Sequence, residues 1–165
     1  DCSVGNANVI ANNVMLAGHV EMGSRNYIGG GAAFHQFCRI GDLTMVGGLA
    51  QVKRDVPPYV LVDGGSGLMV GLNTVGLRRA GVSADDRRQI KAAYRLAFRS
   101  DLAWDEKMHA LQREFPLEPI RSFWEFLADG KRGILTDRRT TSRSTESLHQ
   151  SSNKTNQLLS LRKVG

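Results

Sequence analysis

A six-residue period runs through the first third of the sequence and constrains the fold more than any other feature. Counted from residue 4, the first residue of each of nine successive hexads is apolar. These residues are Val4, Ile10, Leu16, Met22, Ile28, Phe34, Ile40, Val46 and Val52. The second position is Gly or Ala in seven of the nine hexads, and the third position favours Gly, Asn, Ser and Asp. We interpret the small second residue as the one that lets the chain turn, and the third as the one that tolerates left-handed backbone.

A coil with three short flat sides explains this period better than a helix or an ordinary strand. A helix needs apolar residues three and four apart, and a half-buried strand needs strict alternation. In a three-sided coil, one aliphatic side chain per hexad points inward and three hexads complete a turn. Such coils bury their apolar sides only against each other, so they must stack. We therefore predict a mainly β fold, a left-handed parallel β-helix of hexapeptide repeats over residues 1–58, followed by a small α-helical C-terminal region.

The chain changes character after the hexads. Pro57 and Pro58 end them, because proline removes backbone donors and fixes the backbone angle φ. Residues 59–82 contain a glycine cluster that matches no phosphate-binding pattern, and we expect a connecting loop there. Helical spacing follows over residues 83–135, where Ser83 is a typical N-cap with acidic residues in the first turn after it. The apolar stripes of these helices are expected to form a core.

The positive net charge belongs to the end of the chain. Residues 1–130 contain 14 basic and 14 acidic residues, whereas residues 131–165 contain eight basic and two acidic ones. Residues 136–165 are rich in Ser, Thr and Asn, so we expect a disordered basic tail and assign it no function. Nucleic-acid binding is therefore not expected, nor is membrane insertion, because no apolar run approaches the roughly 20 residues that a membrane span needs. Cys2 and Cys38 form no metal motif, and no metal site is expected.

Two histidines interrupt the repeat. His35 occupies a position where the hexads otherwise have a small residue, and His19 follows Gly18. Their separation is close to one coil of three hexads, so stacking should place them near the same corner on adjacent coils. Two interpretations stay open. They are surface imidazoles on a polar edge, or they mark a functional site, since departures from a local rule often do.

A basic patch begins where the helical region begins. Seven basic residues stand between positions 78 and 99, against two acidic ones. The basic residues are Arg78, Arg79, Arg87, Arg88, Lys91, Arg95 and Arg99. This patch is either a solvated face or a docking surface for an acidic partner or a phosphate-bearing ligand.

Four segments, in order along the chain, resemble a known family. They are Leu16-Ala17-Gly18-His19-Val20, His35-Gln36-Phe37-Cys38-Arg39-Ile40-Gly41, Asp55-Val56-Pro57-Pro58-Tyr59 and Asn73-Thr74-Val75-Gly76-Leu77-Arg78-Arg79. Together they resemble the UDP-N-acetylglucosamine acyltransferases of lipid A synthesis, over about residues 1–135. The resemblance implies a cytoplasmic homotrimer without a cofactor, with its sites between subunits. Such an enzyme moves an (R)-3-hydroxyacyl chain from acyl carrier protein to the glucosamine 3-hydroxyl of UDP-N-acetylglucosamine, the first step of lipid A biosynthesis.

The resemblance also implies where the acid–base chemistry lies. The family's general base is a His that would immediately precede Asp1, and Asp1 would orient it. On this interpretation the chain corresponds to the C-terminal part of such an enzyme, and by itself it should have no useful turnover. The Gly18 N–H would stabilise the thioester oxyanion, and His19 would line the same pocket.

The remaining roles follow by position from the same resemblance. His35 and Gln36 would contact substrate, and Asn73 and Arg79 would hold the nucleotide-sugar phosphates. Gly30 and Gly48 would line the acyl channel and leave room for a longer chain. The carrier-docking candidates are Arg78, Arg87, Arg88, Lys91 and Arg95.

Two positions depart from the family pattern. Val75 replaces an acidic residue that is frequent there, and Ala80 replaces a second Arg. Two alternatives therefore remain: a hexapeptide-repeat transferase with another acyl donor or acceptor, and a non-catalytic trimeric scaffold.

Overall fold

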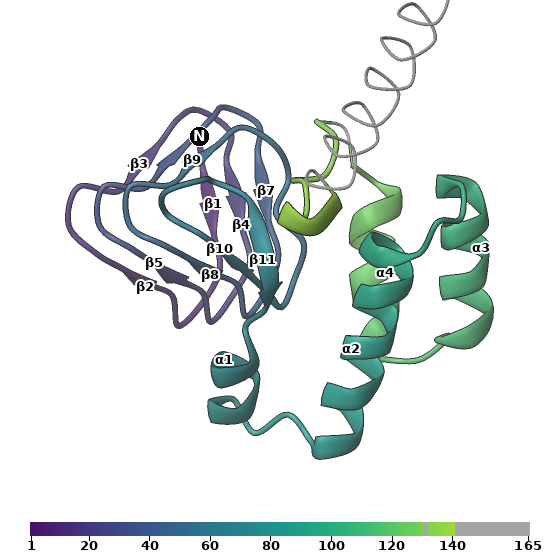
Figure 1. The fold of residues 1–165 in the computed structure, drawn as a ribbon. Coiled ribbons are helices and arrows are strands. Elements are labelled where there is room, and N and C mark those ends of the chain that lie inside the picture. The colour runs from purple at the N-terminus through teal and green to yellow at the C-terminus, as the bar shows by residue number, and fades with distance from the viewer. Residues whose placement is uncertain (131, 141–165) are drawn as a thin grey trace, which may run out of the picture.

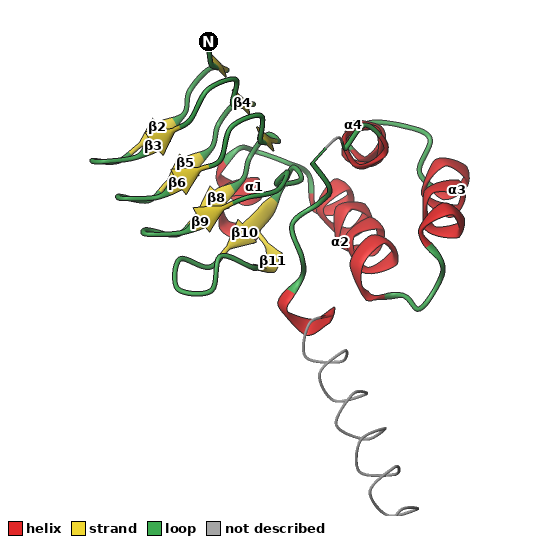
Figure 2. Cartoon of the chain, turned by 90° about the horizontal axis from the view of Figure 1, so that it is seen from above, coloured by secondary structure: helices red, strands yellow, loops and turns green. Residues whose placement is uncertain are grey.

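The computed structural model describes residues 1–130 and 132–140. The disorder expected beyond residue 140 thus lies outside the described residues. Figure 1 shows two parts: a three-sided stack of coils, and a group of helices beside it. The view from above in Figure 2 places helices α2 to α4 together on one side of the stack.

Short strands form the three sides of the stack. They are β1 (Ser3–Val4), β2 (Val9–Ile10), β3 (Met15–Leu16), β4 (Glu21–Met22), β5 (Tyr27–Ile28), β6 (Ala33–Phe34), β7 (Arg39–Ile40), β8 (Met45–Val46) and β9 (Gln51–Val52). Each pairs in parallel with the strand three hexads along the chain, for example Val4 with Met22 and Met22 with Ile40. The sheets are β1-β4-β7, β2-β5-β8 and β3-β6-β9, with further strands joining the second. The predicted left-handed parallel β-helix is confirmed.

The first residue of each hexad fills the interior, as the repeat predicts. Ile28 and Val46 are fully buried, because a coil covers them on each side. Val4 and Ile10 in the first coil remain 43% exposed, since only one neighbouring coil covers them. Burial of these side chains is thus a product of stacking, and no single coil achieves it.

The corners are built differently from our interpretation of the sequence. The left-handed residue is the fourth of each of the first eight hexads, with φ between +54° and +71°. These residues are Ala7, Asn13, His19, Arg25, Gly31, Phe37, Leu43 and Leu49. The second position is small for another reason: a Cβ on Gly29 would lie 2.4 Å from the backbone nitrogen of Gly48 in the next coil. Close stacking of coils selects the small residue, and the turn itself does not.

The predicted connecting loop over residues 59–82 is wrong. β10 (Val60–Val62) pairs in parallel with β8 and extends the second sheet, and β11 (Met69–Leu72) pairs with β10 in antiparallel fashion. α1 (Thr74–Arg79) follows directly. Val60 and Val62 are fully buried and continue the interior row, so apolar burial extends the coil past the two prolines.

The helical part consists of α2 (Ala84–Arg99), α3 (Trp104–Glu114) and α4 (Ile120–Ala128). α2 starts at the expected Ser83 cap, whose hydroxyl accepts a hydrogen bond from the Asp86 N–H at 3.0 Å. Ile90, Leu111 and Phe123, one from each helix, are at most 2% exposed and belong to a shared core. This core makes the three helices one packed unit.

Residues after α4 return to the coils. The Asp55 N–H donates to the Gly133 carbonyl at 3.0 Å, and the Leu135 N–H donates to the Asp55 carbonyl at 2.8 Å. Asp137 is 2% exposed, accepts a hydrogen bond from the Tyr94 hydroxyl and forms an ion pair with Arg99 at 3.6 Å. Burial and the Asp137 carboxylate raise the pKa of Tyr94, so its phenol remains a donor. The tail is therefore ordered at its start, contrary to the disorder expected from residue 136, because Asp137 is bonded into the helical part.

The role of the small corner residue leads to a stability prediction. Gly29→Ala should lower the free energy of unfolding by about 1–3 kcal/mol, because its methyl group would push adjacent coils apart. Gly18→Ala is the matched control, since a Cβ there meets nothing within 4 Å. Urea unfolding followed by circular dichroism measures both variants. Equal stability of the two would contradict coil spacing as the reason for glycine.

Candidate functional site

The two histidines of interest lie on stacked turns. Residues 17–20 connect β3 to β4, and residues 35–38 connect β6 to β7 in the next coil. His19 and His35 therefore share a corner, as their spacing predicts. Both are exposed, but they do not pair with each other. The His19 ring stacks on Phe37, with ring centroids 4.9 Å apart and an interplanar angle of 3°. His35 Nδ1 lies 3.2 Å from the Gln36 carbonyl oxygen.

Gly18 presents an unused backbone donor at this corner. Its carbonyl accepts a hydrogen bond from the Phe37 N–H at 3.0 Å, which holds the two coils together. Within residues 1–130 and 132–140, the Gly18 N–H itself donates to no acceptor. Apart from Gly18 itself and its two chain neighbours, no heavy atom lies within 4 Å of the position that a Cβ would take. An unpaired backbone N–H on an exposed turn is the kind of donor that stabilises an anionic oxygen.

A cavity of about 500 Å³ opens beside the corner. It is lined by His19, Glu21, Phe37, Arg39, Asp55, Asp129 and Arg132. The turns, β4 and β7 form its walls on the prism side, and the segment after α4 forms the opposite wall. The cavity therefore depends on how the helical part is held against the prism.

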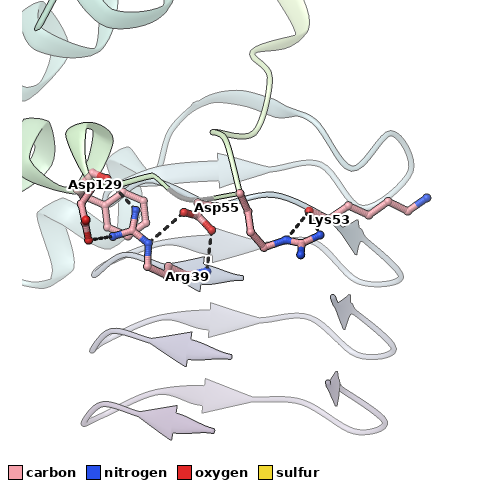
Figure 3. Close-up of polar contacts among 6 residues, drawn as sticks. Arg39, Lys53, Asp55 and Asp129 are labelled. Carbon is pink, nitrogen blue, oxygen red and sulfur yellow. Dashed lines mark hydrogen bonds and ion pairs between the residues drawn. The ribbon is translucent and has the colours of Figure 1, made fainter. Parts of the chain in front are cut away.

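Arg39 holds that arrangement through several contacts. Its Nε lies 3.0 Å from Asp55 Oδ2, and its Nη1 lies 3.0 Å from Asp129 Oδ2. Nη2 donates to the Phe126 carbonyl at 3.0 Å, and the guanidinium lies 4.3 Å from the centre of the Phe126 ring. Figure 3 shows Arg39 between Asp55 on the prism and Asp129 after α4. Asp55 is 1% exposed, so its charge relies on this partner.

Sequence reasoning missed Arg39 as a site residue. It occurs in the segment that carries the resemblance, but its outward position in a hexad marks it only as solvent-facing. Its partners are 16 and 90 residues away. No local pattern could have joined them.

The cysteine at this corner is not an activated nucleophile. Cys38 is buried, and burial raises the pKa of its thiol, partly offset by the charge of Arg132. A thiol that stays protonated is a poor nucleophile. Arg132 also donates to the Lys53 carbonyl, with its Nε and Nη2 both 3.4 Å from the oxygen.

The predicted nucleotide contacts lie on α1, away from this cavity. Asn73 caps α1: its Oδ1 accepts from the Gly76 N–H at 3.0 Å, and its Nδ2 donates to the Leu43 carbonyl at 2.9 Å. Asn73 is 9% exposed, whereas Arg79 is exposed at the end of the helix. Within one chain, the Asn73 side chain is thus already used to cap α1 and to bond to Leu43. The exposed Arg79 side chain is the better placed of the two to contact a phosphate.

The proposed channel glycines occupy a different corner. Gly30 and Gly48 take the same hexad position in adjacent coils, in the turns that lead from β5 to β6 and from β8 to β9. A Cβ on Gly48 would lie 3.1 Å from the Gly30 carbonyl oxygen. Asp1 is exposed at the start of the first coil. One chain therefore does not bring the channel glycines, the histidines and α1 into a single pocket.

The basic patch divides into two groups. Arg87, Lys91 and Arg95 recur at every fourth position of α2 and so share one helical face. Arg87 donates to the Val82 carbonyl at 2.6 Å, while Lys91 and Arg95 are exposed. Arg88 forms an ion pair with Asp85 at 2.7 Å on the surface, so part of its charge is already compensated.

Comparison with known proteins places this geometry in a family. Residues 55–135 match the family model described as UDP-N-acetylglucosamine O-acyltransferase, domain 2. An acyl-[acyl-carrier-protein]–UDP-N-acetylglucosamine O-acyltransferase of Anaeromyxobacter dehalogenans is 43% identical over 135 residues, which are 81% of this chain and 52% of that protein. The chain belongs to the UDP-N-acetylglucosamine O-acyltransferase family.

Solved structures of the family agree with the fold. The UDP-N-acetylglucosamine O-acyltransferase of Moraxella catarrhalis has a TM-score of 0.77 and 43% identity, over 82% of this chain and 53% of that one. The Arabidopsis UDP-N-acetylglucosamine acyltransferase has the same TM-score with 32% identity, over 82% of this chain and 51% of that one. The chain spans about half the length of the relatives that it matches.

The described residues contain neither a membrane span nor a metal cluster. None of their helices is long and apolar enough to cross a membrane. Residues 1–130 and 132–140 contain no group of three or more His, Cys, Asp or Glu side chains arranged to hold a metal ion.

The Arg39 network predicts an asymmetric response to mutation. Arg39→Met should lower the free energy of unfolding by about 3–5 kcal/mol, because it leaves the buried Asp55 carboxylate without its positively charged partner. Asp129→Asn is the control and should cost about 1 kcal/mol or less, since the Asp129 side chain is 73% exposed. Thermal and urea unfolding of both variants measure this difference. A similar decrease in the free energy of unfolding for both variants would show that the Arg39–Asp55 pair is not the main stabilising contact of Arg39.

Proposed function

We propose that this chain is part of an acyltransferase that moves an (R)-3-hydroxyacyl group from acyl carrier protein to the 3-hydroxyl of UDP-N-acetylglucosamine. This is the first step of lipid A biosynthesis, and we place it in the cytoplasm. The observation that carries the proposal is the match of 43% identity to an enzyme named for this reaction. The match covers 81% of this chain.

The residues of the corner with His19 and His35 suit acyl transfer to a hydroxyl. As the hydroxyl attacks the thioester, the carbonyl oxygen becomes negative, and a free backbone N–H such as that of Gly18 stabilises it. His19, His35 and Gln36 supply exposed polar groups beside this position, and we assign them to contacts with the sugar and the acyl donor. Following the resemblance, we assign the general base to a His adjacent to Asp1, and not to His19 or His35.

A second and third copy of the chain would complete the site. The outward face of the second sheet carries an apolar row of four paired residues, Val9, Tyr27, Met45 and Leu61. Val9 and Tyr27 are 56% and 47% exposed. The outward row of the first sheet, in contrast, is Ser3, Glu21 and Arg39. An exposed apolar row next to a polar one supports packing against another copy, and we propose a homotrimer with sites between subunits.

Arg79 and the α2 face fit the two substrates. Arg79 is exposed and permanently charged, as a contact to nucleotide-sugar phosphates requires. Exposed Val75 and half-buried Ala80 supply no charge beside it, so Arg79 should carry more of the phosphate binding. Arg78, Arg87, Lys91 and Arg95 form the proposed docking surface for the acidic acyl carrier protein, and Arg88 contributes less because of Asp85.

Acyl transfer by a chimera tests the proposed reaction. In it, this chain replaces the matching half of the Anaeromyxobacter enzyme. Mass spectrometry should detect 3-hydroxyacyl-UDP-N-acetylglucosamine, and His19→Ala should lower kcat/KM at least tenfold, or about 1.4 kcal/mol of transition-state stabilisation. A folded trimeric chimera without product, or one that prefers another sugar nucleotide, would contradict the proposal.

Binding measurements on the chain itself test the docking surface. Lys91→Glu combined with Arg95→Glu should raise the Kd for acyl carrier protein about tenfold or more, and the difference should shrink at high salt. The Kd for UDP-N-acetylglucosamine should not change. Arg113→Glu is the control, because Arg113 is an exposed cation on α3, outside the patch. An equal rise in the Kd for both ligands would indicate a folding defect and would contradict the docking surface.

A further inference from the structure

The orientation of the His19 ring depends on one neighbour. Within the described ranges 1–130 and 132–140, the His19 side chain forms no hydrogen bond and no ion pair. Its one ring contact is the stack on Phe37, nearly parallel at 3° and 4.9 Å between centroids. An exposed imidazole without a polar partner would otherwise sample several rotamers.

The backbone places these two rings face to face. His19 and Phe37 occupy the same hexad position in adjacent coils, with φ of +59° and +63°. The Phe37 N–H donates to the carbonyl of Gly18, the residue before His19, at 3.0 Å. The pairs β3–β6 and β4–β7 lie on either side of the turn. The register of the coils therefore determines the stack.

Folding alone does not explain an aromatic residue at position 37. Phe37 is 52% exposed and its backbone is left-handed, which is uncommon for a bulky side chain. The same hexad position elsewhere holds Ala7, Asn13, Arg25, Leu43 and Leu49, so the turn accepts large apolar side chains but does not require an aromatic ring. Phe37 also lines the cavity that His19 lines. A contact with His19 is what distinguishes it from these other turn residues.

We propose that Phe37 is a positioning residue for His19 in the acyltransferase site. This inference rests on the function proposed above, in which His19 contacts substrate. A stacked ring covers one face of the imidazole and leaves both nitrogens free in the plane, where a sugar hydroxyl or a thioester arm can meet them. A stacked aromatic pair changes the ratio between two side-chain orientations about two- to tenfold. This is enough to favour one orientation of the His19 imidazole over the alternatives.

Nuclear magnetic resonance on the chain tests the stack directly. With ¹⁵N-labelled histidine, His19→Gln identifies the His19 ring signals by their loss. The His19 carbon-bound ring protons should show an upfield ring-current shift, which Phe37→Leu and Phe37→Met abolish and Phe37→Tyr retains. Leu49→Ala is the control: it removes an exposed apolar side chain at the same hexad position in another turn, and it should leave the His19 signals unchanged.

Substrate affinity supplies the second measurement. Phe37→Leu should raise the Kd for UDP-N-acetylglucosamine about two- to tenfold, and Phe37→Tyr should restore the original value. A lost ring-current shift with unchanged affinity, or a shift that persists in Phe37→Leu and Phe37→Met, would overturn the positioning role. If the unmodified chain shows the shift but binds no UDP-N-acetylglucosamine, this result contradicts the proposed substrate. It also overturns the positioning role, which depends on that substrate. Absence of the shift in a chain that does bind would overturn the positioning role alone.

Discussion

Backbone pairing between coils, repeated at every third hexad, is the constraint on which the rest of this structure depends. Each coil contributes only very short strands, which have no stability by themselves. Stacking supplies both the parallel hydrogen bonds and the cover for the inward aliphatic residues. Because adjacent coils lie so close, the second hexad position must be small, as the 2.4 Å approach at Gly29 shows. The same register brings residues such as Gly18 and Phe37 into contact.

The helical part is joined to this prism by charged and backbone contacts at one side. Arg39 bonds to Asp55 within the prism and to Phe126 and Asp129 at the end of α4. The returning segment then pairs with Asp55 through its backbone. Asp55 is thus shared by both attachments. The cavity beside His19 exists because these contacts hold the segment after α4 in front of the corner.

The chemistry proposed for this family member follows from that arrangement. The corner offers an unused N–H, exposed imidazoles and a neighbouring cavity, but it contains neither the α1 residues nor the channel glycines. These groups lie at other corners or beyond the last coil. A site between copies of the chain would reconcile the separation, and the apolar outward row from Val9 to Leu61 supports such an assembly. Phe37 would then restrict the orientation of the His19 ring within each chain.

The amino-acid sequence by itself determined the coil, the inward residues and the shared corner of His19 and His35, because each follows from a short, regular spacing. It also located the Ser83 cap, which depends on residues three positions apart. It could not determine which hexad position is left-handed, since Gly, Asn, Ser and Asp at the third position are typical turn residues, whereas the fourth position is left-handed with residues as different as Ala7, Arg25 and Leu49. Nor could it show that packing between coils selects the small second residue. Nor could it show that residues 60–72 extend the prism, that Asn73 donates to the Leu43 carbonyl, or that Arg39 joins two parts of the chain. Those features were decided by tertiary structure, because their partners are 16 to 90 residues away and only folding brings them within hydrogen-bonding distance.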